Sequence, residues 1–202
     1  MLLPAEEGGL PESVRKARDG LFEAFAHGLS SMLTERPGTP PRIVSYTKPP
    51  YPELPVDYVD TILIADIETM TPHLLGSGRG IYTEYRARID RVLFNKQKIS
   101  LAETVDIVEL GGFIRLSNGR TLGQIVKGLG NQFELRDKYL LFLNYKDPAQ
   151  AFRIWKAWKI TNDKVYATAI DDLARVQRRA SIVDGKPVEA IISAIQGLLP
   201  RN

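Results

Sequence analysis

Residues 81–93 read IYTEYRARIDRVL, and this stretch decides the fold class. Mostly apolar side chains occupy alternate positions of it: Ile81, Thr83, Tyr85, Ala87, Ile89 and Leu93. Charged side chains stand between them: Glu84, Arg86, Arg88 and Asp90. Because successive residues of a β-strand point to opposite faces of a sheet, the pattern predicts a half-buried strand that is long enough to bend around a barrel.

Further β-rich segments surround this strand. They are DTILIADIE (60–68), TVDIVEL (104–110), FIRLSNGRTLGQIV (113–126), KYLLFLNY (138–145), AFRIWKAWKI (151–160) and KVYATAI (164–170). The dipeptide Asn118-Gly119 predicts a hairpin, since a type I′ turn needs positive φ at both central residues. Residues 71–78 are expected to form a long hairpin loop, and residues 161–163 a polar turn. About seven strands are expected, as in a barrel or sandwich.

Helical periodicity flanks the β-rich region on both sides. Between Pro11 and Arg36, apolar residues recur at three- and four-residue steps, which predicts one amphipathic helix. Pro187 precedes VEAIISAIQGLL (188–199), where its missing N–H is harmless, and this favours a C-terminal helix. The apolar face of that helix must cover the barrel or meet another chain.

These patterns divide the chain into four parts. They are an N-terminal amphipathic helical extension (1–36), a Pro-rich extended arm (37–55), a β-barrel domain (56–169) and a C-terminal helical segment (170–202). The prolines of the arm favour extended, polyproline-like chain. Such an arm can dock in a partner's aromatic groove, but an arm laid along the protein's own surface is the preferred interpretation. The expected fold is mainly β, a single antiparallel OB-like barrel or sandwich with a helix at each end.

The composition is that of an ordinary globular protein. The 202 residues are 44% hydrophobic and 25% charged, with a formal net charge of +3. Because 27 basic residues face 24 acidic ones, bulk charge does not identify a nucleic-acid-binding protein. The sequence has no cysteine, which excludes disulfides, thiolate zinc sites, iron–sulfur clusters and cysteine nucleophiles.

The first residues, MLLPAEEGGLPESVRKARDG, lack the basic start and apolar run of a secretory signal. No apolar stretch approaches the roughly 18 to 20 residues that span a bilayer. We therefore expect no integral membrane span and a cytoplasmic location, with the cell envelope as the alternative if a signal has been removed.

Catalytic chemistry has few candidates. His27 and His73 are the only imidazoles, and a packed or surface histidine is the favoured interpretation of each because neither has a companion at metal-ligand spacing. Acidic residues cluster near the start of the barrel region: Asp57, Asp60, Asp66 and Glu68. Paired carboxylates can serve acid–base chemistry or calcium, but a solvated strand face is favoured.

Two glycine-containing stretches, GSGRG (76–80) and KGLGNQ (127–132), invite comparison with phosphate-binding loops. Neither matches GxxxxGK followed by Ser or Thr, so both are interpreted as loops. No catalytic residue, metal site or cofactor is expected.

Basic and aromatic residues alternate on two of the predicted strands. The candidate binding residues are Tyr82, Arg86, Arg88, Arg153, Trp155, Lys156, Trp158 and Lys159. This mixture is typical of single-stranded nucleic-acid binding, in which cations follow phosphates while rings stack on bases. Strict alternation places Trp155 and Trp158 on opposite faces, however, so at least one of them is expected in the core.

The order DTILIADI, IYTEYRARIDRVL, TVDIVELGGFIRL and KYLLFL resembles a loosely defined group of uncharacterised bacterial β-barrel domains. The resemblance covers roughly residues 56–167 and rests on apolar patterning together with Gly111 and Gly112. It implies an OB-like or related barrel and supplies no catalytic residues. Export signals are common in that group, so the resemblance favours the cell envelope, whereas the N-terminal sequence favours the cytoplasm.

The predicted function is a non-catalytic structural or protein-binding subunit whose helical and Pro-rich extensions contact a larger assembly. The candidate interface residues are Leu21, Phe22, Phe25, Leu29, Tyr46, Tyr51, Ile191 and Ile195. An OB-like module that binds single-stranded nucleic acid is the alternative, and a hydrolase or metal-dependent enzyme is the third hypothesis. Helices that fold back onto the barrel of a stable monomer would argue against the first hypothesis.

Overall fold

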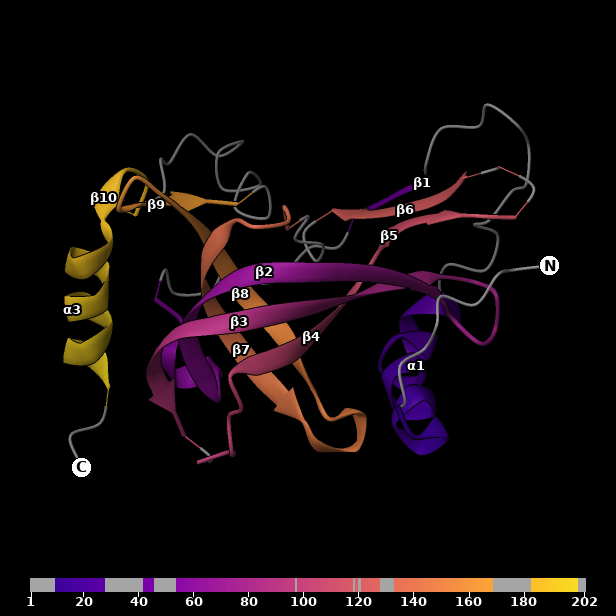
Figure 1. Ribbon diagram of the computed structural model, residues 1–202, viewed down its shortest axis with the longest axis horizontal. Helices are drawn as coiled ribbons and strands as arrows, with labels where there is room; N and C mark the ends of the chain where they lie inside the picture. Colours follow the sequence, from indigo (N-terminus) through magenta and orange to yellow (C-terminus); the bar gives the residue numbers. More distant parts are fainter. Residues whose placement is uncertain are drawn as a thin grey trace.

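The computed structural model describes residues 10–27, 42–45, 54–96, 98–117, 119, 121–127, 133–168 and 183–199. Within these residues the chain is mainly β, with one helix near each end, as the sequence predicts (Figure 1). Helix α1 spans Glu12–His27 and helix α3 spans Val188–Leu198. Neither is long and apolar enough to cross a membrane, and the same holds for every helix in the described part of the chain.

Ten strands and two single-turn 3-10 helices complete the described structure. The strands are β1 (Arg42–Ser45), β2 (Thr61–Leu74), β3 (Ile81–Asn95), β4 (Thr104–Leu110), β5 (Gly112–Arg115), β6 (Thr121–Lys127), β7 (Lys138–Lys146), β8 (Ala151–Thr161), β9 (Lys164–Ala167) and β10 (Lys186–Pro187). The 3-10 turns are η1 (Val56–Tyr58) and η2 (Asp147–Ala149).

Five of the strands close into a ring. β2 pairs with β3, β3 with β4, β8 with β7, and β7 with β2, all antiparallel. The ring is completed by a short parallel pairing of β4 with β8, in which Ile107 is opposite Phe152 and Val108 is opposite Arg153. β9 and β10 extend the sheet beyond β8, while β1, β6 and β5 form a separate three-stranded sheet. Closure pairs each strand of the ring on both sides along part of its length, which reduces the number of unpaired backbone groups at strand edges.

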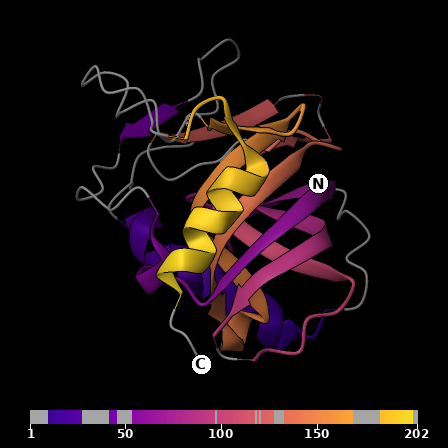
Figure 2. The same cartoon turned by 90° about the vertical axis from the view of Figure 1, so that its left-hand side faces the viewer.

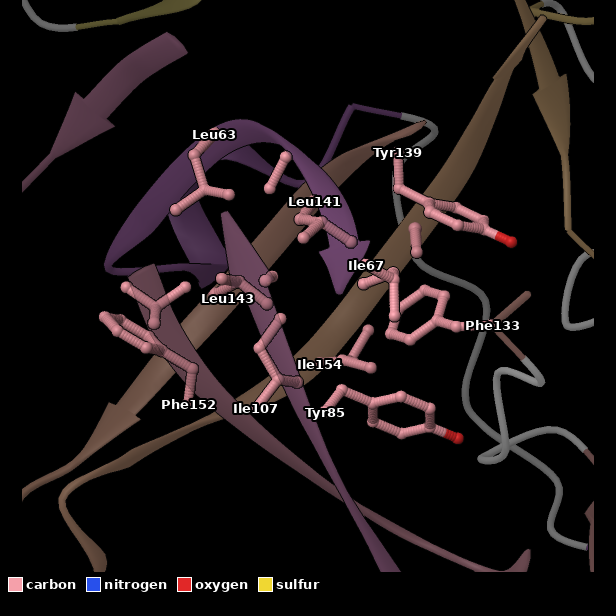
Figure 3. Close-up of a cluster of buried hydrophobic side chains, with 14 residues drawn as sticks. Leu63, Ile67, Tyr85, Ile107, Phe133, Tyr139, Leu141, Leu143, Phe152 and Ile154 are labelled. Carbon is pink, nitrogen blue, oxygen red and sulfur yellow. The ribbon is translucent and has the colours of Figure 1, made fainter. Parts of the chain in front are cut away.

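The interior of the ring is a continuous apolar core. Alternate residues of all five strands point into it, and Phe133 joins them from the segment before β7 (Figure 3). Its members are Leu63, Ala65, Ile67, Tyr85, Ala87, Val105, Ile107, Phe133, Tyr139, Leu141, Leu143, Phe152, Ile154 and Ala157. Tyr85 and Tyr139 each contact the Phe133 ring, with centroids 4.9 Å and 4.6 Å away.

A second apolar layer lies between the ring and α3, which crosses the outside of the barrel (Figure 2). Ile191, Ile192 and Ile195 of α3 are buried there against residues of β2, β7 and β8. This layer explains the apolar run ILIA at residues 62–65 of β2, because that half of the strand is covered on both faces. Leu198, the last residue of α3, is 52% exposed.

β2 is longer than the sequence predicts, because it continues through Pro72 to Leu74 and leaves only residues 75–80 as the loop to β3. The expected hairpin between these strands is confirmed, but its loop begins at residue 75 instead of residue 71. Proline is tolerated here because β7 pairs only with residues 61–66 of β2, so Pro72 has β3 as its sole strand partner. Three register shifts between β2 and β3 bend this long pair around the barrel.

The hairpin predicted at Asn118-Gly119 is confirmed, since β5 and β6 pair antiparallel on either side of it. Its connection spans residues 116–120, however, so it is longer than a two-residue turn. Gly119 adopts a φ of +80°, and Asn118 lies outside the described residues. A two-residue turn joins β8 to β9 instead, where Asn162 and Asp163 have φ values of +49° and +56°.

Six residues of the predicted arm are described: Leu54, Pro55 and the four residues of β1, which runs parallel to β6. Residues 37–41 and 46–53 of the arm lie outside the described residues, and so do residues 128–132 and 169–182.

Candidate functional site

Helix α1 covers one side of the barrel, at the end opposite α3 (Figure 1). It lies over the outer faces of β3 and β4, beside loop 75–80 and η2. We call this covered surface the α1 face. Among the side chains of α1 that the structure describes, Val14, Arg18 and Phe22 are buried, and their spacing of four residues places them on one side of the helix.

Arg18 is the polar centre of the contact and is only 1% exposed. Its Nη1 lies 2.9 Å from Oε1 of Glu84 on β3, and its Nη2 lies 3.0 Å from Oδ2 of Asp106 on β4. Nε donates to the carbonyl oxygen of Ala149 at 3.0 Å, and Nη2 also donates to that of Gln150 at 3.4 Å. We call these two carboxylates and two carbonyl oxygens the guanidinium site. A buried cation is tolerated only with such compensation, because its transfer out of water costs several kcal/mol.

The charges of the guanidinium site reinforce one another. Burial acts to lower the pKa of Arg18, but the hydrogen bonds and charges of Glu84 and Asp106 outweigh it and hold the pKa above its usual value. Burial likewise acts to raise the pKa of Glu84, yet His73 and Arg18 together lower it. Nε2 of His73 lies 3.5 Å from Oε2 of Glu84. Arg18 and Glu84 are therefore both ionised at neutral pH.

An aromatic contact accompanies the ion pairs. The ring of Phe22 is fully buried and stacks on Tyr82 with centroids 5.5 Å apart. On another side, the guanidinium carbon of Arg153 lies 4.6 Å from the centre of the same ring. Arg153 is held by Glu109, whose Oε1 is 3.2 Å from its Nη2. Tyr82 in turn stacks on His73, at 5.1 Å.

The glycine-containing loop 75–80 closes the site along the helix. The backbone N–H of Ser77 donates to Glu23 of α1 at 3.1 Å. A Cβ atom on Gly76 would lie 3.2 Å from Oδ2 of Asp19, so this glycine lets the loop approach α1 closely. Loop 75–80 thus serves turn formation and helix contact, in line with the interpretation of GSGRG as a loop.

The chemistry of the site is recognition of a cation and a ring. Its acceptors are carboxylate and carbonyl oxygens arranged around a planar guanidinium, which is the geometry that arginine satisfies and lysine does not. Among the described residues, no three histidine, cysteine, aspartate or glutamate side chains are grouped to hold a metal ion. Two of the four acids considered for calcium, Asp66 and Glu68, pair instead with Arg88, at 2.8 Å and 3.3 Å.

The candidate binding residues on β3 do not share one environment. Tyr82 is 1% exposed beneath Phe22, so it cannot stack on a base while α1 is in place. Arg86 and Arg88 are exposed on the outer face of β3, but each is paired with carboxylates. Nε of Arg86 lies 3.4 Å from Oδ1 of Asp106, and Arg88 pairs with Asp66 and Glu68. These arginines therefore form a mixed-charge surface.

The candidates on β8 are also divided. Trp158 is fully buried in the layer beneath α3, with the ring of Phe142 5.0 Å away, and its assignment to a binding surface is wrong. Trp155 is partly buried and stacks on Tyr58 at 6.0 Å. Lys156 lies over the Trp158 ring at 5.0 Å. Lys159 pairs with Glu134 and Asp137, mainly through hydrogen bonds that raise its pKa.

The candidate interface residues that the structure describes face the protein itself. Phe22 packs on the α1 face, and Leu21 is partly buried beside it. Ile191 and Ile195 of α3 are buried against the barrel. Their assignment to an interface with another chain is wrong for this structure, because the barrel already covers their apolar surface. The side chain of Phe25 and all of Leu29, Tyr46 and Tyr51 lie outside the described residues.

Sequence reasoning missed Arg18, Glu84, Asp106 and Glu109 as site residues. One local signal was present, since Arg18 stands four residues after Val14 and four before Phe22, inside the apolar stripe of the helix. A charged residue inside an apolar helix face requires a buried partner. The partners themselves lie about 65 to 90 positions away, and no local pattern connects them.

No protein-family model matches this chain, and neither a curated protein nor a solved structure does. The resemblance to bacterial barrel domains therefore rests on the sequence patterns alone.

Proposed function

We propose that this protein is a non-catalytic binding subunit that uses an OB-type barrel to hold another protein. The observation that carries the proposal is the order of the ring. The first four barrel strands lie in the order β7-β2-β3-β4, so the fourth returns beside the first, as in a Greek key. β8, the fifth strand, closes the ring between β4 and β7. A five-stranded Greek-key barrel is the architecture of the OB fold.

The position of the α1 face supports a binding role. OB barrels bind ligands on the face of their second and third strands, between the loops that join strands one to two and four to five. Here those strands are β3 and β4, and the loops are residues 75–80 and 147–150. Both strands and both loops contact α1.

The charges favour a protein over a nucleic acid as the ligand. A polyanion is held by cations that neutralise its phosphates. On the outer face of β3, Arg86 and Arg88 already face carboxylates, and those carboxylates repel phosphate. A surface of interspersed charges suits the polar rim of a protein interface.

Single-stranded nucleic acid stays the second candidate because of one aromatic feature. Tyr58 is 50% exposed and stacks on the partly buried Trp155. Stacked, accessible rings of this kind can hold a base.

Native mass and oligonucleotide binding separate the two functions. The protein is purified gently from its source, and its native mass is compared with the chain mass of 22.6 kDa. We expect a defined assembly with a second protein, and no binding of fluorescein-labelled oligothymidine at low salt. A lone monomer whose anisotropy rises with oligothymidine, with affinity that falls steeply as salt is added, would replace the proposal by the nucleic-acid function.

A further inference from the structure

We infer that the α1 face is a recognition surface for an amphipathic helix carrying an arginine and, four residues later, an aromatic residue, and that α1 is its resident occupant. The incoming helix belongs to a partner protein and displaces α1. This inference rests on the proposed protein-binding function and names the site and the chemistry of its ligand.

The guanidinium site belongs to the barrel, not to the helix. Glu84, Asp106 and the carbonyl oxygens of Ala149 and Gln150 all lie on β3, β4 or the connection from β7 to β8. When α1 leaves, Glu84 and Asp106 lose their buried cation and keep only the longer contacts with His73 and Arg86, which makes the face complementary to another guanidinium. Arginine is required, because its planar fork reaches both carboxylates at once, whereas lysine offers a single ammonium group.

The aromatic requirement follows from the neighbouring contact. Tyr82 and Arg153 lie on the barrel at the position where the ring of Phe22 packs. Arg18 and Phe22 are separated by four residues, the spacing that places two side chains on one side of a helix. The barrel therefore recognises an arginine and a ring at that separation.

The contact between α1 and the barrel is shallow enough to open. The apolar cluster beneath α1 is the smallest of the three in the described structure. Of the helix side chains that the structure describes, only Val14, Arg18 and Phe22 are buried. Gly20 in the middle of α1 lowers the helix propensity further. Elements with few buried contacts open locally while the rest of the fold persists.

Displacement is a competition with a tethered ligand. A segment that belongs to the same chain as its binding site competes as if present at about millimolar concentration. A free helix of equal affinity therefore binds the wild-type chain poorly and binds a chain with weakened α1 well.

The test mixes the full chain carrying Arg18→Ala with a fluorescein-labelled peptide of residues 10–27 and measures binding by the fluorescence anisotropy of the peptide. We expect the peptide to bind this variant at least about tenfold more tightly than it binds the wild-type chain, because the tethered competitor is weakened. A peptide with Arg18→Lys is the matched control and should bind at least about tenfold more weakly. Adding Glu84→Gln to the variant chain should weaken the wild-type peptide similarly.

The mobility of α1 is measured in the same variant chains. The chain has no cysteine, and nothing lies within 4 Å of a Cβ atom at Gly20, so a spin label at Gly20→Cys reports helix mobility without disturbing the contact. If α1 stays immobile in Arg18→Ala, Phe22→Ala is added to release it.

Three results would overturn the inference. The first is that the peptide does not bind a chain whose α1 is mobile. The second is that the Arg18→Lys peptide binds as tightly as the wild-type peptide. The third is that the variant chain dimerises by exchange of α1, which would make a second copy the occupant. A native assembly with another protein would still support the proposed function in each case, so the two failures are distinguishable.

Discussion

Replacement of Arg18 by alanine should release α1 without unfolding the barrel. The substitution leaves Glu84 and Asp106 without their buried cation, and loss of one partner of a buried ion pair costs about 3–5 kcal/mol. Because those carboxylate side chains are 18% and 25% exposed, water recovers part of this cost, and we expect about 2–3 kcal/mol. The helix can avoid the penalty by leaving the face, so the cost appears as opening of α1.

Native-state hydrogen exchange measures this opening residue by residue. A loss of about 2–3 kcal/mol corresponds to roughly 30- to 150-fold faster exchange of α1 amides, while amides of β2 and β7 keep their protection. Arg15→Ala is the matched control, since Arg15 lies on the exposed side of α1 and pairs with Glu12 nearby. Such surface pairs contribute at most about 1 kcal/mol. Unchanged α1 exchange in Arg18→Ala, or an equal loss of protection in the barrel strands, would refute the reasoning.

Three further predictions concern the layers and the charges. Trp158→Ala should lower the free energy of unfolding by about 3–5 kcal/mol in urea titrations because the side chain is fully buried, whereas Trp155→Ala should cost clearly less. Docking of α1 should weaken in acid. Burial acts to raise the pKa of Glu84, but His73 and Arg18 together lower it, and only Arg18 leaves with the helix. The stabilisation from the Arg18–Glu84 pair is therefore present at neutral pH and is lost as the pH falls through the lowered pKa of Glu84, a dependence that spin-label mobility should show and Glu84→Gln should diminish. In thermal melts, Gly112→Ala should destabilise the fold by more than about 1 kcal/mol, because φ at Gly112 is +137° and the new Cβ atom would lie 2.3 Å from Oγ1 of Thr83. Gly119→Ala is the control and should cost less, because no atom lies within 4 Å of a Cβ atom there.

The barrel was predictable because its signals are local. Alternation along residues 81–93 identifies β3 and the same period identifies β4, whereas β7 and β8 are identified by their runs of apolar and aromatic residues. The apolar stripes of the two ends identify α1 and α3 in the same way. Each of these patterns reports which side of one element is buried, and burial against the barrel produces it whatever the order of the strands.

The two tryptophans show where local reasoning fails. Strict alternation along β8 groups Lys156 with Ile154 and Trp158, but the pairing with β7 shifts register there, with Leu143 opposite Ile154 and Phe142 opposite Lys156. Trp155 is the extra residue of this bulge, so the strand changes face beyond it. Ala157 then points into the ring and Trp158 toward α3.

The α1 face was beyond sequence reasoning for a different reason. Glu84, Asp106 and Arg18 come from β3, β4 and α1, and these elements meet only when the ring has closed and α1 has packed on it. Ring closure itself depends on the parallel contact of β4 with β8, which has no signature in either strand alone.

Site-specific photocrosslinking tests the central claim, that this barrel binds a protein through the face of β3 and β4. A single cysteine carrying a benzophenone is placed at Arg86, whose side chain is 57% exposed beside the α1 face, or at Lys164 on β9 as the control. The chains are then illuminated within the native assembly. We predict a covalent adduct with one defined protein from position 86 and none from position 164. Adducts of equal yield from both positions, or from neither, would contradict the account.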